Sequence, residues 1–178
     1  MKIFLDTTQS DFVACLFDEN FKIKNKIIKE TIYKVEEIPQ FFTTLLINEK
    51  IKVQDIKDFY INVGPGSFTG ARIALVYVRT IAQMTGAKIS ITNSFKLLTN
   101  KEEELFIFAN KNHSFKIKVL DIEDIAKVTL VEKSLLEQKI NYAALLSDFT
   151  NQQHLFTQTD IASINPEYGS SPQIGSGK

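Results

Sequence analysis

Cysteine and histidine are scarce in this chain of 178 residues, which holds one cysteine and two histidines. The single cysteine, Cys15, excludes a disulfide within the chain and any zinc site built from several thiolates. We therefore expect it to lie in the core and the protein to work in a reducing compartment. His113 and His154 are distant in sequence and do not match the paired histidines of a zinc protease. They also provide no evident general base for Ser67, which lies outside a Gly-x-Ser-x-Gly motif.

An excess of charge and long apolar runs are also missing. The chain carries 21 basic and 21 acidic residues, so its net charge gives no general attraction to a nucleic acid or an anionic membrane. The apolar run at residues 73–78 is far shorter than the roughly 20 residues that span a bilayer. The apolar start of the chain meets Asp6 too early for a signal peptide. We expect a soluble cytoplasmic protein that makes no membrane contact and whose contact with RNA is local or supplied by a partner.

The first half of the chain predicts three strands followed by alternating helices and strands. Apolar residues make up 44% of the chain, which is typical of a folded protein, and its length suits one domain or two small lobes. The predicted strands cover residues 2–5, 12–17, 21–28, 58–63 and 88–91, and the helices cover 35–47 and 71–85. Gly86 is placed to end the second helix. This βββαβαβ order indicates an α/β fold with a mixed sheet.

The second half begins after the charged residues 101–104 and predicts a smaller unit. Its expected strands cover residues 105–109, 115–120, 126–131 and 142–146, and its expected helices cover 134–139 and 152–164. From Pro166 onward we expect an ordered connection that passes into a Gly/Ser tail. The predicted division is an N-terminal lobe at 1–100, a reduced C-terminal lobe at 101–168 and a flexible tail at 169–178.

The residues that stand out are Gly-Pro-Gly-Ser-Phe-Thr-Gly at positions 64–70, between a predicted strand and a predicted helix. The glycines allow positive φ or close backbone approach, and Pro65 stiffens the turn. Ser67 or Thr69 can cap the following helix, whose free N–H groups favour an anion or a carbonyl. The segment has neither the Lys-Ser/Thr ending of a Walker loop nor the spacing of a dinucleotide fingerprint. It is therefore either a ligand loop or a tight corner between strand and helix.

The helix behind this loop is apolar over most of its circumference. Arg72, Arg79 and Gln83 form a narrow polar stripe, and apolar residues cover the rest. Because packing on one sheet does not need so wide an apolar surface, we expect the helix to contact its own sheet on one side and a partner protein on another. The alternative is a central helix enclosed by its own domain. The residues expected to contact the partner are Leu75, Val78, Arg79 and Ala82.

Three features resemble the TsaB family: the order of strands and helices, the opening Ile-Phe-Leu-Asp-Thr-Thr, and Gly-Pro-Gly-Ser-Phe-Thr-Gly-Ala-Arg followed by an apolar helix. The resemblance covers residues 1–98 and is weak beyond them. It implies an actin-like ATPase (ribonuclease H-like) fold of two lobes, with the second lobe reduced. It also implies membership of the bacterial machinery that makes threonylcarbamoyladenosine in tRNA.

The resemblance further implies partners and site residues. TsaB proteins pair with the catalytic subunit TsaD through helices of the N-terminal lobe, work with the ATPase TsaE, and can form homodimers. We therefore expect a non-catalytic scaffold that meets tRNA only through the complex. Such a chain would bind no cofactor alone, and ATP or ADP with Mg²⁺ would bind, if at all, at the complex junction. The loop residues expected to bind the partner are Gly64, Pro65, Gly66, Ser67, Phe68, Thr69, Gly70 and Arg72.

The rival interpretation is a stand-alone ATPase or kinase of the same fold. Active ATPases of this fold use an aspartate at the end of the first strand and a glycine in the adjoining hairpin. Asp6 matches the aspartate, but the turn at residues 6–11 contains no glycine, which argues against a tight phosphate cradle. Asp6, Thr7 and Thr8 would then be a vestigial nucleotide site, with hydroxyl groups that satisfy the turn's own backbone. A third alternative is a homodimer with an unrelated regulatory role.

Overall fold

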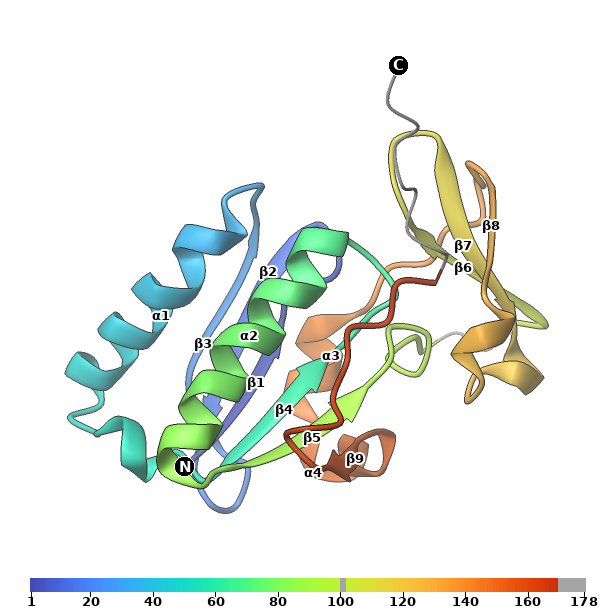
Figure 1. The fold of residues 1–178 in the computed structure, drawn as a ribbon. Coiled ribbons are helices and arrows are strands. Elements are labelled where there is room, and N and C mark those ends of the chain that lie inside the picture. Colours follow the sequence, from blue (N-terminus) through green and yellow to red (C-terminus); the bar gives the residue numbers. More distant parts are fainter. Residues whose placement is uncertain (100–101, 170–178) are drawn as a thin grey trace.

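The computed structural model of the chain describes residues 1–99 and 102–169 (Figure 1). Within these ranges the strands form one six-stranded and one three-stranded sheet. The first sheet consists of β1 (Lys2–Asp6), β2 (Asp11–Phe17), β3 (Ile23–Glu30), β4 (Asp58–Asn62), β5 (Lys88–Thr92) and β9 (Thr157–Thr159). The second consists of β6 (Glu104–Phe108), β7 (His113–Lys118) and β8 (Thr129–Glu132).

The larger sheet is mixed, with strand order β3-β2-β1-β4-β5-β9. Strands β1, β2 and β3 form an antiparallel meander, β1, β4 and β5 run parallel, and β9 pairs antiparallel with β5. The βββαβαβ order predicted for the first half is therefore confirmed. The fold is a mixed α/β fold, as the alternation of helices and strands predicts.

Helices cover both faces of the larger sheet (Figure 1). The long helices α1 (Lys34–Asn48) and α2 (Phe68–Thr85) lie on one face, and the short helices α3 (Tyr142–Ser147) and α4 (Phe149–Gln152) lie on the other. The 3-10 turns are η1 (Val53–Asp55), η2 (Val119–Asp121), η3 (Ile125–Lys127) and η4 (Gln153–Leu155). Among the described helices, none is long and apolar enough to cross a bilayer.

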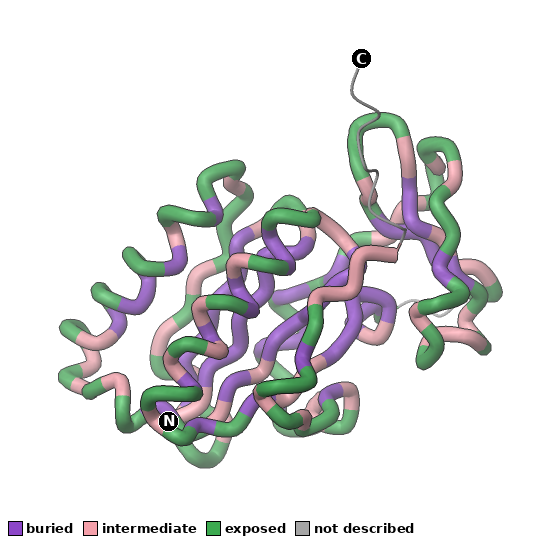
Figure 2. The backbone as a smooth tube through the Cα atoms, in the orientation of Figure 1, coloured by how far each residue is buried: buried purple, intermediate pink, exposed green. Residues whose placement is uncertain are grey.

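Strand β1 is buried on both faces, and its alternate residues belong to two separate cores. Ile3 and Leu5 pack with α1 and α2, whereas Phe4 packs with α3 and α4. Successive side chains of a strand point to opposite faces, which produces this division. Figure 2 shows the result, because buried residues follow the central strands and the inner sides of the helices.

Predictions for the second half were only partly correct. The strand predicted at residues 142–146 is wrong, because this segment is α3, with Asn141 as its N-cap. The helix predicted at 134–139 is absent, and the one predicted at 152–164 is replaced by η4, β9 and a turn. The strand predicted at 105–109 matches β6. Those predicted at 115–120 and 126–131 match β7 and β8, with shifted ends.

The C-terminal part of the chain returns to the first sheet. Strand β9 pairs with β5, so it crosses the predicted boundary between 1–100 and 101–168. That division into lobes stays a prediction. Of the tail predicted at 169–178, residues 170–178 lie outside the described residues.

Helix α2 ends at Thr85, as predicted, but begins at Phe68, three residues before the predicted start. Ser67 is its N-cap and accepts a hydrogen bond from the Gly70 N–H at 3.2 Å. Gly86 follows the last turn with a φ of 72°, in the left-handed region that glycine adopts without strain. Of the two caps that the sequence allowed, Ser67 and Thr69, the helix uses Ser67, and the glycine stop is confirmed.

We expect Gly86→Ala to lower the free energy of unfolding by about 1 kcal/mol, because a side chain is strained at this φ. Crowding does not contribute, since nothing lies within 4 Å of the position that the new Cβ would take. Gly86→Asn should destabilise less, because asparagine tolerates the left-handed region better. Denaturant unfolding of the three proteins measures both effects, and equal stability of the parent and Gly86→Ala would contradict the role of Gly86.

Candidate functional site

The loop at residues 64–70 packs directly on the turn that follows β1. The Ser67 N–H donates to the Thr8 carbonyl at 2.6 Å, and the Thr7 hydroxyl donates to the Gly70 carbonyl at 2.6 Å. A Cβ on Gly66 would lie 2.3 Å from the Thr8 carbonyl oxygen, and one on Gly70 would lie 1.9 Å from that of Thr7. Glycine is therefore required at both positions by the close approach of two backbone segments.

The start of the loop is held by segments from two other parts of the chain. The Ser94 hydroxyl donates to the Pro65 carbonyl at 2.7 Å, and the Ser94 N–H donates to the Gly64 carbonyl at 2.8 Å. The Glu167 N–H donates to the Val63 carbonyl at 2.8 Å, and the Glu167 carbonyl fills the place of a Gly64 side chain. The loop is thus a tight corner fixed on three sides.

Asp6 lies beneath this corner, fully buried and enclosed by hydrogen bonds. One carboxylate oxygen accepts from the Thr8 N–H at 2.8 Å and the Thr8 hydroxyl at 2.7 Å. The other accepts from the Asn62 amide and from the Tyr142 hydroxyl, both at 2.8 Å. Burial raises the pKa of Asp6, and the hydrogen bonds from Asn62, Thr8 and Tyr142 oppose that rise.

A buried lysine completes this polar cluster. Lys34, in the first turn of α1, donates from Nζ to the Thr7 carbonyl at 3.0 Å and also to the Gln9 carbonyl. Burial lowers the pKa of Lys34, while the charges of Asp6 and Asp11 raise it. The ammonium group therefore satisfies carbonyl groups of the β1–β2 turn that no strand pairing reaches.

At the end of β1, groups that could hold a nucleotide phosphate bond to one another. A phosphate cradle needs backbone N–H groups that point at the anion, but the N–H groups of Thr8 and Ser67 already have partners within the chain. Hydrogen bonds also occupy both oxygens of Asp6, so neither faces a cleft where a metal ion would bind. Asp6, Thr7 and Thr8 are brought together, but as a closed polar core.

The apolar residues of α2 that the sequence predicts to contact a partner are buried inside the protein. Leu75, Val78 and Ala82 are at most 2% exposed and pack on the helix's own sheet. Arg79, predicted at the rim of a partner contact, donates to the Ile164 carbonyl of its own chain at 3.3 Å. Small and medium side chains face the sheet because they let the helix approach it closely. The exposed side carries other apolar residues, and Val76 is 64% exposed.

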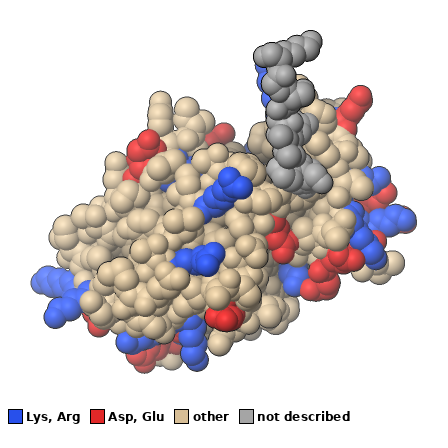
Figure 3. Space-filling model, in the orientation of Figure 1, with Lys and Arg blue, Asp and Glu red and all other residues tan. Residues whose placement is uncertain are grey.

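A groove with a volume of about 520 Å³ lies between α1 and α2. It is lined by Val35 and Pro39 of α1 and by Arg72, Ile73, Val76, Tyr77, Thr80 and Ile81 of α2. Figure 3 shows uncharged surface between the two helices, with blue and red side chains at intervals around it. The exposed apolar surface of α2 therefore lies on a different stripe from the one predicted to contact a partner.

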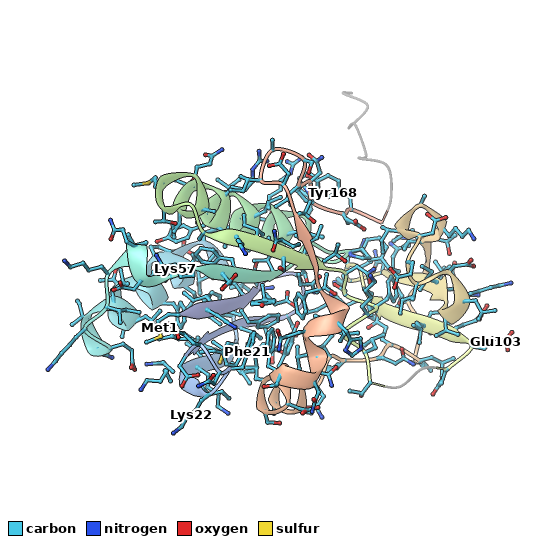
Figure 4. All side chains as sticks on the ribbon, turned by 90° about the horizontal axis from the view of Figure 1, so that it is seen from below. Met1, Phe21, Lys22, Lys57, Glu103 and Tyr168 are labelled. Atoms are coloured by element: carbon cyan, nitrogen blue, oxygen red, sulfur yellow. The ribbon has the colours of Figure 1, made fainter. Side chains whose placement is uncertain are left out.

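Arg72 lies at the end of this groove, beside the C-terminal segment of the described chain. Its guanidinium carbon is 3.9 Å from the ring centroid of Phe68, and its Nε donates to the Tyr168 hydroxyl at 2.6 Å. Figure 4 shows Tyr168 alongside α2. The sequence predicted roles for Arg72 and Phe68 but gave no signal for Tyr168, which is 96 positions from Arg72.

The other candidate residues lie apart from this site. Cys15 is buried in β2, as predicted, and burial raises the pKa of its thiol to about 12. His113 starts β7 and His154 lies in η4. In the described part of the chain, no group of three or more histidine, cysteine or acidic side chains could hold a metal ion.

Comparison with known proteins identifies a similar fold. No family model matches the chain. It is 31% identical over 84 residues to "Uncharacterized protein MG208" of Mycoplasma genitalium, which is 44% of this chain and 41% of that protein. It is similar to YeaZ from Pseudomonas aeruginosa, with a TM-score of 0.54 and 16% identity over 78% of this chain and 63% of that chain.

A second solved structure, described as an uncharacterized protein with similarity to peptidase YEAZ from Pseudomonas aeruginosa, has a TM-score of 0.55 and 16% identity. The match covers 78% of this chain and 62% of that one. The chain thus spans less than half of the curated relative and less than two thirds of either solved chain. The comparisons therefore show a fold similar to that of YeaZ.

We expect Gly70→Ala to lower the free energy of unfolding by about 3 kcal/mol, because its Cβ would meet the Thr7 carbonyl oxygen at 1.9 Å. Gly86→Ala is the matched control, since it adds the same methyl group where no atom is near. Chemical denaturation of the two variants should give the larger loss for Gly70→Ala. A smaller loss than in the control would mean that the loop does not need its close contact with the turn.

We expect Tyr142→Phe to lower the free energy of unfolding by about 2 kcal/mol at pH 7, because Asp6 loses a donor. Burial and the charge of Asp6 raise the pKa of Tyr142 well above 10.0, so the parent chain loses stability as the pH rises past 10. Because the variant lacks this group, its free energy of unfolding should fall less steeply with pH than that of the parent, by about 1.4 kcal/mol per pH unit. Unfolding measured between pH 7 and pH 11 tests this. Tyr33→Phe, at an exposed site, serves as the control. If the free energies of unfolding of the parent and Tyr142→Phe changed with pH in parallel, the buried contact would be contradicted.

Proposed function

We propose that this chain is a non-catalytic scaffold subunit of a tRNA threonylcarbamoyladenosine complex, similar to TsaB, that docks on the catalytic subunit TsaD. The observation that carries the proposal is the apolar groove between α1 and α2, which adjoins a loop with the TsaB-like sequence. The similarity of the fold to YeaZ supports it. An actin-like architecture with two lobes is part of the same proposal.

The surface around the groove suits a protein partner. Val35 is 52% exposed and Val76 is 64% exposed on neighbouring helices, and Ile73 and Tyr77 line the same groove. Covering such apolar side chains stabilises a complex by about 25 cal/mol for each Å² removed from water. Two parallel rows of apolar side chains on neighbouring helices also offer a trough into which a partner helix can lay its own apolar side.

The closed polar core around Asp6 favours a scaffold over a stand-alone ATPase. An autonomous enzyme of this type would use Asp6 and the loop at 64–70 to hold a metal and phosphate. In this chain Asp6 is fully buried, and Thr8 and Ser67 use their N–H groups internally. The loop therefore contributes by fixing the first turn of α2, which carries residues of the proposed docking surface.

The remaining partners follow from the same proposal. TsaE would meet the chain within the complex, and tRNA would be bound through the complex and not by this subunit alone. Any ATP or ADP with Mg²⁺ would be held at the junction by groups that the partners supply. A homodimer through the same helices is an alternative state, because a second copy presents the same apolar surface.

We expect Val76→Glu to weaken binding to TsaD by at least about tenfold, because a carboxylate would be buried in an apolar contact. Its effect on the free energy of unfolding should stay within about 0.5 kcal/mol, since the side chain is exposed. Leu135→Glu makes a similar change at a fully exposed leucine of the second half and serves as the control. Titration of TsaD with the three proteins measures the affinities, and equal binding by all three would reject this surface.

We expect the purified chain alone to show no turnover of ATP with Mg²⁺, because its aspartate is closed off. Addition of TsaD and TsaE should make hydrolysis detectable in the mixture. A phosphate-release assay on the chain alone and on the mixture separates the scaffold from the rival enzyme. Turnover by the chain alone that disappears in Asp6→Asn would establish the rival.

A further inference from the structure

We infer that Tyr168 positions Arg72 to receive a carboxylate from the docking partner, so that the C-terminal segment forms part of the docking surface. The inference rests on the proposed function. Arg72 is an exposed residue and the one charged side chain among those that line the groove. The first turn of α2 contains no acidic residue, so α2 itself does not neutralise this charge there.

The guanidinium group of Arg72 is held on two sides. Its carbon lies 3.9 Å from the Phe68 ring centroid and 5.1 Å from that of Tyr168, and the two rings lie 4.8 Å apart. Its Nε donates to the Tyr168 hydroxyl at 2.6 Å. Among the residues that the structure describes, no acceptor bonds either Nη group. These two groups form the fork that matches a carboxylate with two parallel hydrogen bonds.

Tyr168 is itself fixed by its neighbours in the chain. The Glu167 N–H is bonded to the Val63 carbonyl at 2.8 Å. Gly169 adopts a φ of 64°, and a Cβ there would lie 2.9 Å from the Phe115 ring and from Pro65. The residues on both sides of Tyr168 are therefore anchored, and its hydroxyl can restrict Arg72 before a partner arrives. Restricting a side chain in advance reduces the entropy lost on binding.

The surroundings of Arg72 favour a protein carboxylate over an RNA phosphate. The groove beside it is otherwise lined by apolar residues and Thr80. The other arginine of the helix, Arg79, is engaged by the Ile164 carbonyl. Nucleic-acid binding requires several cations along a surface, and this one offers a single guanidinium in an apolar setting. The partner that fits is an apolar helix with one aspartate or glutamate at its edge.

The test is a double-mutant cycle on TsaD binding with Arg72→Ala, Tyr168→Phe and the double variant. Arg72→Ala should weaken binding at least about tenfold, and Tyr168→Phe, which keeps the ring, about threefold to fivefold. In the Arg72→Ala background, Tyr168→Phe should have no further effect, because its role passes through Arg72. The binding of the parent should also fall more with added salt than that of Arg72→Ala.

Arg79→Ala is the matched control, because it removes the other arginine that contacts the C-terminal segment but does not line the groove. It should bind TsaD within about twofold of the parent. The inference would be overturned if Tyr168→Phe weakened TsaD binding as much in the Arg72→Ala background as in the parent. It would also be overturned if Arg72→Ala bound TsaD like the parent but lost tRNA binding. Failure of the parent to bind TsaD would overturn the proposed function and this inference together, whereas parent binding that no variant weakens would overturn only the inference.

Discussion

The close contact between two backbone segments, the turn after β1 and the loop before α2, is the constraint on which the rest of the structure depends. The carbonyl oxygens of Thr7 and Thr8 occupy the space where side chains of Gly70 and Gly66 would lie. This contact places the N-terminus of α2 over the end of β1 and aligns the helix on the sheet. It also closes the space above Asp6, so the polar residues beneath it become part of the core.

This arrangement separates the chemistry of the chain from its surface. Asp6, Asn62 and Tyr142 form a hydrogen-bonded buried network, which stabilises the fold. The apolar groove and the arginine at its end, by contrast, are open to solvent. On the proposed function, such a protein would act through binding energy, and its partner would supply the groups that react. The C-terminal segment contributes to both parts, because it anchors the loop through Glu167 and holds Arg72 through Tyr168.

The sequence predicted the first half well, because alternation and helical periodicity are strong there and glycine marks the corners. It failed where the signal was ambiguous. The apolar run at 142–146 suits a strand or a helix, and only the burial of Tyr142, Leu145 and Leu146 at helical spacing identifies α3. Helix α2 is apolar over most of its circumference, so the sequence could not tell which apolar stripe meets its own sheet. The partners of Asp6 and Arg72 lie 136 and 96 positions away, so no local pattern indicates them.

The central claim, that a partner covers the groove between α1 and α2, is tested most directly by hydroxyl-radical footprinting of the chain alone and coexpressed with TsaD. The account predicts that Val35, Val76 and Tyr77 become protected in the complex, while the fully exposed Leu135 reacts equally in both samples. Protection of Leu135 with unchanged labelling of the groove residues, or separate elution of the two proteins, would contradict it.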